Sequence, residues 1–176
     1  QLKRHLRAAK VIPDFQYGFQ PGLSCEHAVT HLASLVAAGR DRGETVLVAS
    51  ADCSAAFDTV THELLLRKLE TFCGIEGDAL HVIRTYLAGR RQRTKMSKGR
   101  SQWRQVPCGV PQGSVWGPLL FTLYTADIGR HVTAAELVMY ADDITLVVSH
   151  KDATVAKTRM NEALIQLADY ARGNRM

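Results

Sequence analysis

The sequence predicts an α+β fold in which an antiparallel sheet packs on helices. Several segments repeat apolar residues at the spacing of one helical face, and three short apolar runs have the length of buried strands. Two of these runs, at 137–140 and 144–149, are separated by only three residues. So short a connection favours a hairpin, and therefore antiparallel pairing.

The N-terminal half contains three helical patterns and one strand. Ser24 can cap a helix that ends near Gly39 and Gly43, and a valine-rich strand follows at 45–51. Thr61 and Asp78 can cap two more helices, the second of which stops at Gly89. We expect the inward residues to be Ala28, Leu32, Leu35 and Val36 in the first helix, Leu65, Leu69 and Phe72 in the second, and Leu80, Ile83, Tyr86 and Leu87 in the third.

The C-terminal half begins with a hairpin pattern over residues 91–107 that turns at Lys98-Gly99. Ser114, or the pair Gly117-Pro118, opens a helix that runs to about Gly129, since proline is tolerated in a first helical turn. After the two strands, Asp152 can cap a last helix. Its inward residues should be Ala156, Met160, Ala163, Leu164, Leu167 and Ala171.

Length and composition describe one globular domain. The chain has 176 residues, of which 46% are hydrophobic and 22% charged, and this argues against disorder, collagen and low complexity. A chain of this size buries roughly two-thirds of its unfolded surface. The net charge of +5 is mildly basic, which suits a polyanionic partner but is also common in proteins without one.

The cysteine spacing and the hydropathy exclude several classes of protein. No cysteine pair has CxxC or zinc-finger spacing, so we expect reduced, intracellular thiols at Cys25, Cys53, Cys73 and Cys108. No apolar run approaches 18 residues and no signal-peptide pattern is present, so no membrane partner is expected. The chain starts without methionine and stops just past a helical pattern, and we expect it to be part of a longer polypeptide.

Carboxylates follow the predicted strands. Asp142-Asp143 lie between two apolar runs, and Asp52 ends another, with Asp58 six residues on. Aspartate favours turns, so an adjacent pair can be plain turn chemistry. Neighbouring like charges at the end of a buried strand are nevertheless costly without a cation. Mg²⁺ would relieve this cost, and two such ions can activate a hydroxyl and stabilise a leaving pyrophosphate.

Two further signals each allow two interpretations. The segment 109–114, GVPQGS, is either turn punctuation or a nucleotide contact, in which Gly113 permits close backbone approach and Gln112 offers an amide. Residues 79–126 contain no acid. The same stretch holds Trp103 and eight bases, so it is either a solvated face or a track for phosphates. The bases are Arg84, Arg90, Arg91, Arg93, Lys95, Lys98, Arg100 and Arg104.

In series, five strings resemble the reverse transcriptase domain of non-LTR (LINE-type) retrotransposons. They are QYGF at 16–19, SADCSAAFDTVTHELLLRKL at 50–69, TYLAGRRQ at 85–92, GVPQGSVWGPLLFTLY at 109–124 and YADD at 140–143. Their order and spacing match that family over nearly the whole chain. The resemblance implies a polymerase palm with part of the fingers over 1–176, and with the thumb absent.

The resemblance also implies the roles of individual residues. Asp52, Asp142 and Asp143 would be catalytic and would hold two Mg²⁺, or Mn²⁺, with the Cys53 carbonyl as a further ligand. Phe57 would be the steric gate against a ribose 2′-OH, and Asp58 would fix the following turn rather than bind metal. The nucleotide site would comprise Ala55, Ala56, Phe57, Gln112 and Gly113, and the nucleic-acid contacts would be Arg90, Arg91 and Arg93.

Some features depart from the family pattern. Ala51 stands where the family usually has a larger hydrophobic residue, and Gln20 stands where arginine is frequent. The basic fingertip that clamps the triphosphate, the lysine-bearing segment beyond Asn174 and the thumb all lie outside this sequence. The catalytic acids can therefore be intact in a chain that is inactive alone.

The resemblance implies an RNA-directed DNA polymerase that adds dNTPs to a DNA primer on an RNA template during retrotransposition. Expected partners are those nucleic acids together with the thumb and endonuclease domains of a parent polyprotein. The expected location is the nucleus or a cytoplasmic ribonucleoprotein. Two alternatives stay open: a non-catalytic, decayed or repurposed palm that binds RNA, and another palm polymerase such as a group II intron maturase, which the GPLLF run disfavours.

Overall fold

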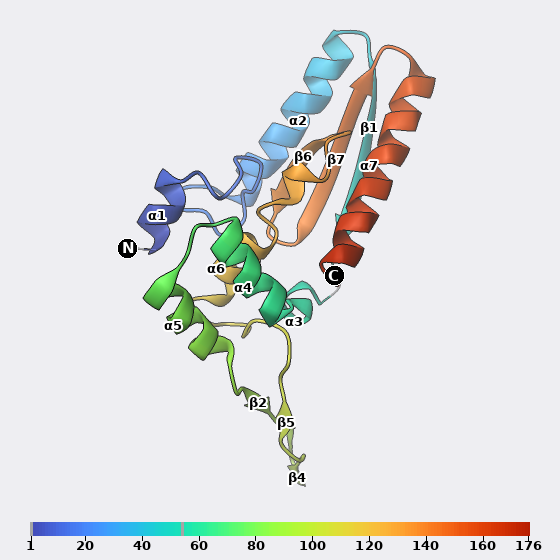
Figure 1. The fold of residues 1–176 in the computed structure, drawn as a ribbon. Coiled ribbons are helices and arrows are strands. Elements are labelled where there is room, and N and C mark those ends of the chain that lie inside the picture. The colour runs from blue at the N-terminus through green and yellow to red at the C-terminus, as the bar shows by residue number, and fades with distance from the viewer. Residues whose placement is uncertain (1, 54) are drawn as a thin grey trace.

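The computed structural model describes residues 2–53 and 55–176, and its centre is a three-stranded antiparallel sheet (Figure 1). The strand order is β1 (Thr45–Asp52), β7 (Asp143–His150), β6 (Glu136–Tyr140). Residues Gln16 and Met139 form an isolated parallel bridge on the outer edge of β6. With helices on both sides of this sheet, the predicted α+β class is confirmed.

The two faces of the sheet are covered to different extents. α7 (Ala153–Gly173) packs on one face, where the cross-strand pairs Ala51–Ile144 and Leu47–Val148 belong to the same apolar cluster as its inward side chains. α2 (Cys25–Asp41) lies on the other side (Figure 1). Gly39 permits the approach of α2, because a Cβ there would lie 2.6 Å from Val46. Elsewhere on that face Val48 and Ser50 are exposed, whereas Val138 and Val147 are buried.

A second apolar core is formed by helices and lies beside the sheet (Figure 1). Its fully buried side chains include Leu65, Leu69, Ile83 and Phe121. Cys53 packs against both this cluster and the sheet cluster. The helices are α1 (Leu2–Ala8), α3 (Ala56–Thr59), α4 (His62–Thr71), α5 (Gly77–Leu87) and α6 (Gly117–Tyr124), and a short 3-10 helix, η1 (Ile128–Arg130), follows.

A long hairpin projects away from both cores (Figure 1). β2 (Arg91–Gln92) pairs with β5 (Arg104–Gln105), and β3 (Lys95–Met96) pairs with β4 (Gly99–Arg100). The predicted hairpin is therefore confirmed. Its turn is shifted by one residue from the expected Lys98-Gly99, because Gly99 already pairs with Met96.

Several of the predicted helix boundaries are confirmed. Ser24, Thr61 and Asp152 are the N-cap residues of α2, α4 and α7. The Asp152 carboxylate accepts hydrogen bonds from the backbone N–H groups of Thr154 and Val155, which holds the pKa of Asp152 below its ordinary value.

Other expectations were wrong in detail. Glu76, not Asp78, is the N-cap of α5, and Asp78 lies in the first turn, where the helix dipole favours a negative charge. The helix expected to reach Gly129 ends at Tyr124, and the chain then turns so that Asp127 meets Lys68. Leu164 is exposed because the inward stripe of α7 runs through Met160, Ala163, Leu167 and Tyr170, which leaves Leu164 beside it. Asp143 starts β7 instead of lying in the turn.

A buried polar network joins the two cores. Lys68 of α4 donates hydrogen bonds to the Tyr124 carbonyl (2.8 Å) and to the Asp127 carboxylate (2.7 Å), and it lies over the Tyr124 and Tyr170 rings. The Tyr170 hydroxyl donates to the same carboxylate at 2.7 Å. Burial lowers the pKa of Lys68, while Asp127 favours its charged form. Helices α4, α6 and α7 therefore meet at one ion pair.

We expect Lys68→Met to lower the free energy of unfolding by about 3 kcal/mol, because the Asp127 carboxylate would stay largely buried without its cation. The double variant Lys68→Met/Asp127→Leu should recover most of this loss. Urea unfolding measures both, with Arg67→Met on the exposed side of α4 as the control. If the double variant loses as much stability as Lys68→Met and Asp127→Leu lose together, the two residues are not coupled.

Candidate active site

The two predicted groups of carboxylates meet at one end of the sheet. Asp52 is the last residue of β1, Asp143 is the first of β7, and the two are directly paired in the antiparallel register. Directly opposed residues point to the same face with their Cβ atoms roughly 5 Å apart. The next pair on this face is Ser50–Thr145, whose hydroxyl oxygens lie 3.4 Å apart. The carboxylates therefore belong to the face that α7 does not cover.

Asp142 lies in the turn that joins β6 to β7, beside this pair. It is half-buried, whereas Asp52 and Asp143 are exposed. Burial raises the pKa of the nearby Cys53 thiol, and the charges of Asp142, Asp52 and Asp143 raise this pKa further. All three carboxylates act on this one sulfur.

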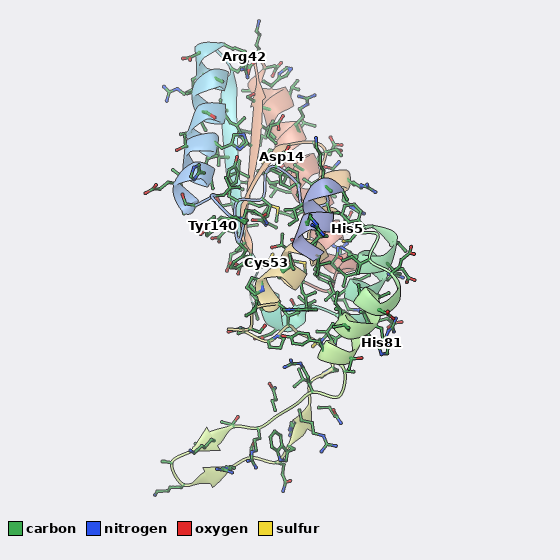
Figure 2. All side chains as sticks on the ribbon, turned by 90° about the vertical axis from the view of Figure 1, so that its left-hand side faces the viewer. His5, Asp14, Arg42, Cys53, His81 and Tyr140 are labelled. Carbon is green, nitrogen blue, oxygen red and sulfur yellow. The ribbon has the colours of Figure 1, made fainter. Side chains whose placement is uncertain are left out.

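The residues that flank these carboxylates lie between the sheet and the helical core. Figure 2 labels Cys53, which follows Asp52, and Tyr140, which precedes the turn. Both lie near the end of the sheet that is next to the helical core. The structure thus brings together Asp52, Cys53, Asp142 and Asp143, as the resemblance implied.

The described residues contain no group of three or more His, Cys, Asp or Glu side chains that could hold a metal ion. The site consists of two strand ends and a turn, with Asp52 and Asp143 exposed and Asp142 half-buried. This donor set still suits Mg²⁺, which proteins usually bind through one or two carboxylates completed by water and substrate phosphates. The Cys53 carbonyl accepts a hydrogen bond from the Ala56 N–H (3.0 Å), and a carbonyl oxygen carries two lone pairs.

Phe57 is held in a stack of aromatic rings just beyond Asp52. Its ring stacks on Phe121 of α6 at 4.8 Å and meets Phe19 edge-on at 6.1 Å. Ala55 is exposed in the left-handed conformation (φ 56°) and starts α3, whereas the Ala56 side chain is buried. Ala56 can therefore contribute to a ligand site only through its backbone. The sequence did not single out Phe19 or Phe121 as neighbours of Phe57.

The loop at 109–116 is attached to the segment that carries Phe57. The Val110 N–H donates to the Phe57 carbonyl, and the Gly109 N–H donates to the Val60 carbonyl, both at 2.7 Å. A Cβ on Gly109 would lie 3.0 Å from the Asp58 carbonyl oxygen, so this glycine permits the contact. Gln112 and Gly113 are exposed on the outer part of the loop. This glycine-rich segment thus forms a turn, and Gln112 and Gly113, its two predicted ligand residues, are accessible.

The basic residues of the hairpin have different environments. Arg90 is half-buried, donates to the Tyr86 carbonyl at 2.9 Å and lies over the Tyr86 ring. Arg91 and Arg93 are exposed, and Arg93 lies over the Trp103 ring at 4.4 Å. Arg90 therefore secures the base of the hairpin, and Arg91 and Arg93 are exposed on it.

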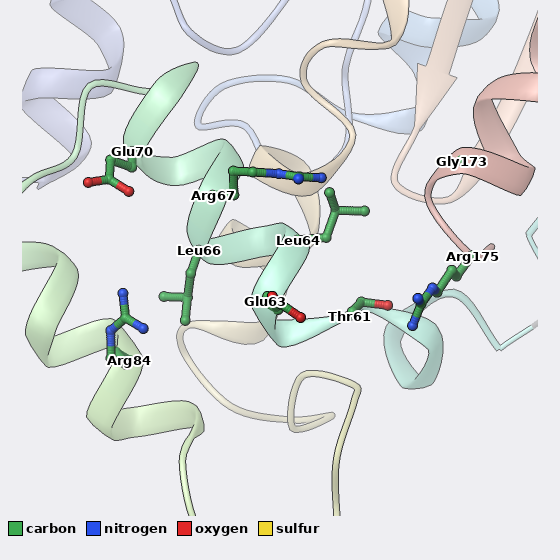
Figure 3. Close-up of a pocket in the computed structure, with 9 residues that line it drawn as sticks. All are labelled: Thr61, Glu63, Leu64, Leu66, Arg67, Glu70, Arg84, Gly173 and Arg175. Carbon is green, nitrogen blue, oxygen red and sulfur yellow. The ribbon is translucent and has the colours of Figure 1, made fainter.

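A cavity of about 410 Å³ lies elsewhere, between α4, α5 and the C-terminal end of α7 (Figure 3). Arg67, Arg84 and Arg175 line it together with the carboxylates Glu63 and Glu70. The three arginines slightly outweigh the two glutamates, so the lining is weakly positive. None of the residues predicted to bind a ligand lines the cavity. The candidate active site is therefore an open surface at the carboxylates and not this cavity.

Comparison with known proteins agrees with the resemblance found in the sequence. The family described as "Reverse transcriptase (RNA-dependent DNA polymerase)" matches residues 1–176. No described helix is long and apolar enough to cross a membrane.

Curated relatives carry names of the same kind. A probable RNA-directed DNA polymerase from transposon BS of Drosophila melanogaster is 32% identical over 170 residues, which are 93% of this chain and 18% of the relative. The RNA-directed DNA polymerase from mobile element jockey of the same species is 26% identical over 169 residues, 92% of this chain and 18% of the relative. A reverse transcriptase-like protein of Chlamydomonas reinhardtii is 25% identical over 150 residues, 80% of this chain and 35% of the relative. The chain thus spans less than a fifth of the two Drosophila relatives.

Proposed function

Because this chain belongs to the reverse transcriptase (RNA-dependent DNA polymerase) family, we propose that it carries the nucleotidyl-transfer site of an RNA-directed DNA polymerase. The observation that carries the proposal is the strand register that sets Asp52 opposite Asp143, with Asp142 in the adjoining turn. The two Drosophila relatives compared above are named as polymerases of a transposon and of a mobile element, which supports a role in retrotransposition.

The reaction is the addition of a dNTP to the 3′-OH of a DNA primer paired with an RNA template. The primer oxygen bonds to the α-phosphorus, the bond to pyrophosphate breaks, and the hydroxyl proton passes to solvent. Asp52 and Asp142 would be the main ligands of two Mg²⁺ or Mn²⁺ ions, assisted by Asp143 and the Cys53 carbonyl. When bound, such ions activate the hydroxyl and neutralise the leaving pyrophosphate.

Side chains near the carboxylates would select the nucleotide. The Phe57 ring packs between Phe121 and Phe19, and these contacts favour one orientation of the ring toward a bound sugar. A ring under the sugar leaves no room for a 2′-OH, which favours dNTPs over rNTPs. The backbone at Ala55 and Ala56 would contact the triphosphate and sugar, and Gln112 and Gly113 would contact the nucleotide and template.

We assign residues 1–176 to a partial reverse transcriptase domain. The sheet with α2 and α7 would be the palm, and the projecting hairpin would belong to the fingers. RNA template, DNA primer and dNTPs are the proposed partners, together with thumb and endonuclease domains. Since base pairing selects the nucleotide, the protein needs to hold the nucleic-acid backbone rather than read its sequence.

The hairpin is the proposed nucleic-acid contact. Arg91, Arg93, Lys95, Lys98, Arg100 and Arg104 are all exposed on it, and no acid lies on it to offset their charge. The Trp103 side chain is 54% exposed and offers a flat face beside these cations. Phosphates attract such a surface, and bases stack on exposed aromatic rings.

We expect Asp142→Ala in the full-length protein to reduce primer extension on an RNA template roughly 100-fold or more, because a carboxylate that places metal charge at the reacting phosphate is lost. Asp58→Ala is the control, since Asp58 is an exposed aspartate six residues beyond Asp52 that is not expected to bind metal. Equal DNA synthesis by wild type and Asp142→Ala would refute the catalytic assignment and leave a non-catalytic palm that binds RNA.

Phe57→Val should raise the ratio of rNTP to dNTP incorporation, by roughly tenfold, because the smaller side chain leaves room for the 2′-OH. Phe57→Tyr keeps the ring and should leave the ratio unchanged. Single-nucleotide insertion kinetics with matched dNTP and rNTP substrates measure the ratio. If Phe57→Val and wild type discriminate equally, Phe57 is not the gate.

The double variant Arg91→Glu/Arg93→Glu should weaken RNA binding and reduce the slope of log affinity against log salt concentration by about 1 to 2. Lys151→Glu/Lys157→Glu changes the net charge equally, at exposed positions around the start of α7, and should alter the slope less. Affinities at several salt concentrations decide the matter. Equal slopes for both double variants would mean that the hairpin is only a solvated basic surface.

A further inference from the structure

One buried glutamine holds the turn that presents Asp142. The Gln16 side chain is 2% exposed, and its amide meets both backbone groups of Ala141. The Gln16 oxygen accepts from the Ala141 N–H at 3.0 Å, and the Gln16 nitrogen donates to the Ala141 carbonyl at 3.1 Å. The same oxygen accepts from the Gly18 N–H at 2.7 Å. A single side chain thus satisfies three backbone groups.

The segment around Gln16 is itself fixed to the strand that enters the turn. The Tyr17 N–H donates to the Met139 carbonyl at 2.9 Å, and the Met139 N–H donates to the Phe15 carbonyl at 2.8 Å. Residues far from the turn in sequence therefore extend the sheet along β6. Gln16 reaches Ala141 from a backbone that is held in place by strand-like hydrogen bonds.

The turn needs such support because its backbone is strained. Ala141 is buried with φ 58°, a left-handed conformation that residues other than glycine rarely adopt. Such a conformation is strained and persists only where its surroundings enforce it. Gly18 contributes to this enforcement, because a Cβ there would lie 2.2 Å from the Ala141 nitrogen. Gln16 bonds the Ala141 backbone from one side, and the Gly18 backbone packs directly against it.

The conformation of Ala141 sets the direction of the two residues that follow it. These are Asp142 and Asp143, the second of which pairs with Asp52. We propose that Gln16, together with the close contact at Gly18, is a positioning element that fixes the left-handed turn at Ala141 so that Asp142 and Asp143 converge with Asp52 on a divalent cation. This inference rests on the proposed function of the carboxylates and assigns its geometric support to a segment more than 100 residues away in sequence.

The competing interpretation is that Gln16 merely satisfies a buried turn and contributes to stability alone. The two interpretations differ in metal affinity. Removal of a residue that orients metal ligands typically costs 10- to 100-fold in metal affinity. A purely structural hydrogen bond, once lost, lowers stability while the folded protein keeps its affinity.

The test measures Mn²⁺ binding by electron paramagnetic resonance, with Mn²⁺ as the probe, in wild type, Gln16→Met and Gly18→Ala. We expect both variants to raise the Mn²⁺ dissociation constant by about 10-fold or more. Hydrogen exchange of the peptide that contains Ala141 should also become faster in Gln16→Met, since its N–H loses its acceptor. Gly18→Ala changes no hydrogen-bonding side chain, so it tests the inference where Gln16→Met does not fold.

Two control variants separate positioning from stability. Tyr124→Phe removes a buried hydrogen bond, from the Tyr124 hydroxyl to the Asn174 carbonyl at 2.6 Å, outside the carboxylate site. Gly22→Ala adds a Cβ at a left-handed glycine where nothing lies within 4 Å. Both should lower stability and leave Mn²⁺ affinity unchanged.

The outcomes distinguish this inference from the proposed function. If wild type binds no Mn²⁺, or if Asp142→Asn binds it as wild type does, the proposed function fails and this inference fails with it. If wild type binds Mn²⁺ through Asp142 but Gln16→Met and Gly18→Ala bind it equally well, the proposed function stands and the positioning role is refuted.

Discussion

The pairing of β1 with β7 is the constraint on which the site depends. This register continues through eight residue pairs and ends by placing two like charges, Asp52 and Asp143, opposite each other. Directly opposed like charges destabilise a sheet, so this end of the pairing is held by the rest of the ladder and not by its own contacts. The apolar pairs on the face covered by α7 fix the register, because a shift of β1 against β7 by one residue would move their side chains out of this core.

The site lies at a junction between two cores, and this position explains how its parts come from distant segments. The sheet core supplies Asp52 and the turn at Asp142. The helical core supplies Phe57, fixed on α6 by its stack with Phe121. The Lys68 network keeps the two cores together, so the arrangement of carboxylates and aromatic ring depends on one buried ion pair as well as on apolar packing.

Unusual backbone conformations gather around this junction. Phe19, Ala55 and Ala141 all have left-handed φ values although none is a glycine. Phe19 contacts Phe57, Ala55 opens the turn that carries Phe57, and Ala141 precedes Asp142. Strain of this kind persists only where neighbouring contacts enforce it, and it concentrates at functional sites. At Ala141 those contacts can be named, and they come from Gln16 and Gly18.

The sequence alone determined the α+β class and most of the helices and strands, because periodicity, caps and turn residues act over a few neighbours. Local patterns also singled out Asp52, Asp142 and Asp143, but only the family resemblance implied that these residues and Cys53 come together, and the register of β1 with β7 decided that Asp52 meets Asp143. Only the tertiary structure decided that Arg90 is engaged by Tyr86, that Leu164 faces solvent and that Gln16 bonds Ala141. Each of these facts depends on which distant segment packs against the residue. Local sequence patterns do not specify such contacts, because they extend over only a few neighbouring residues.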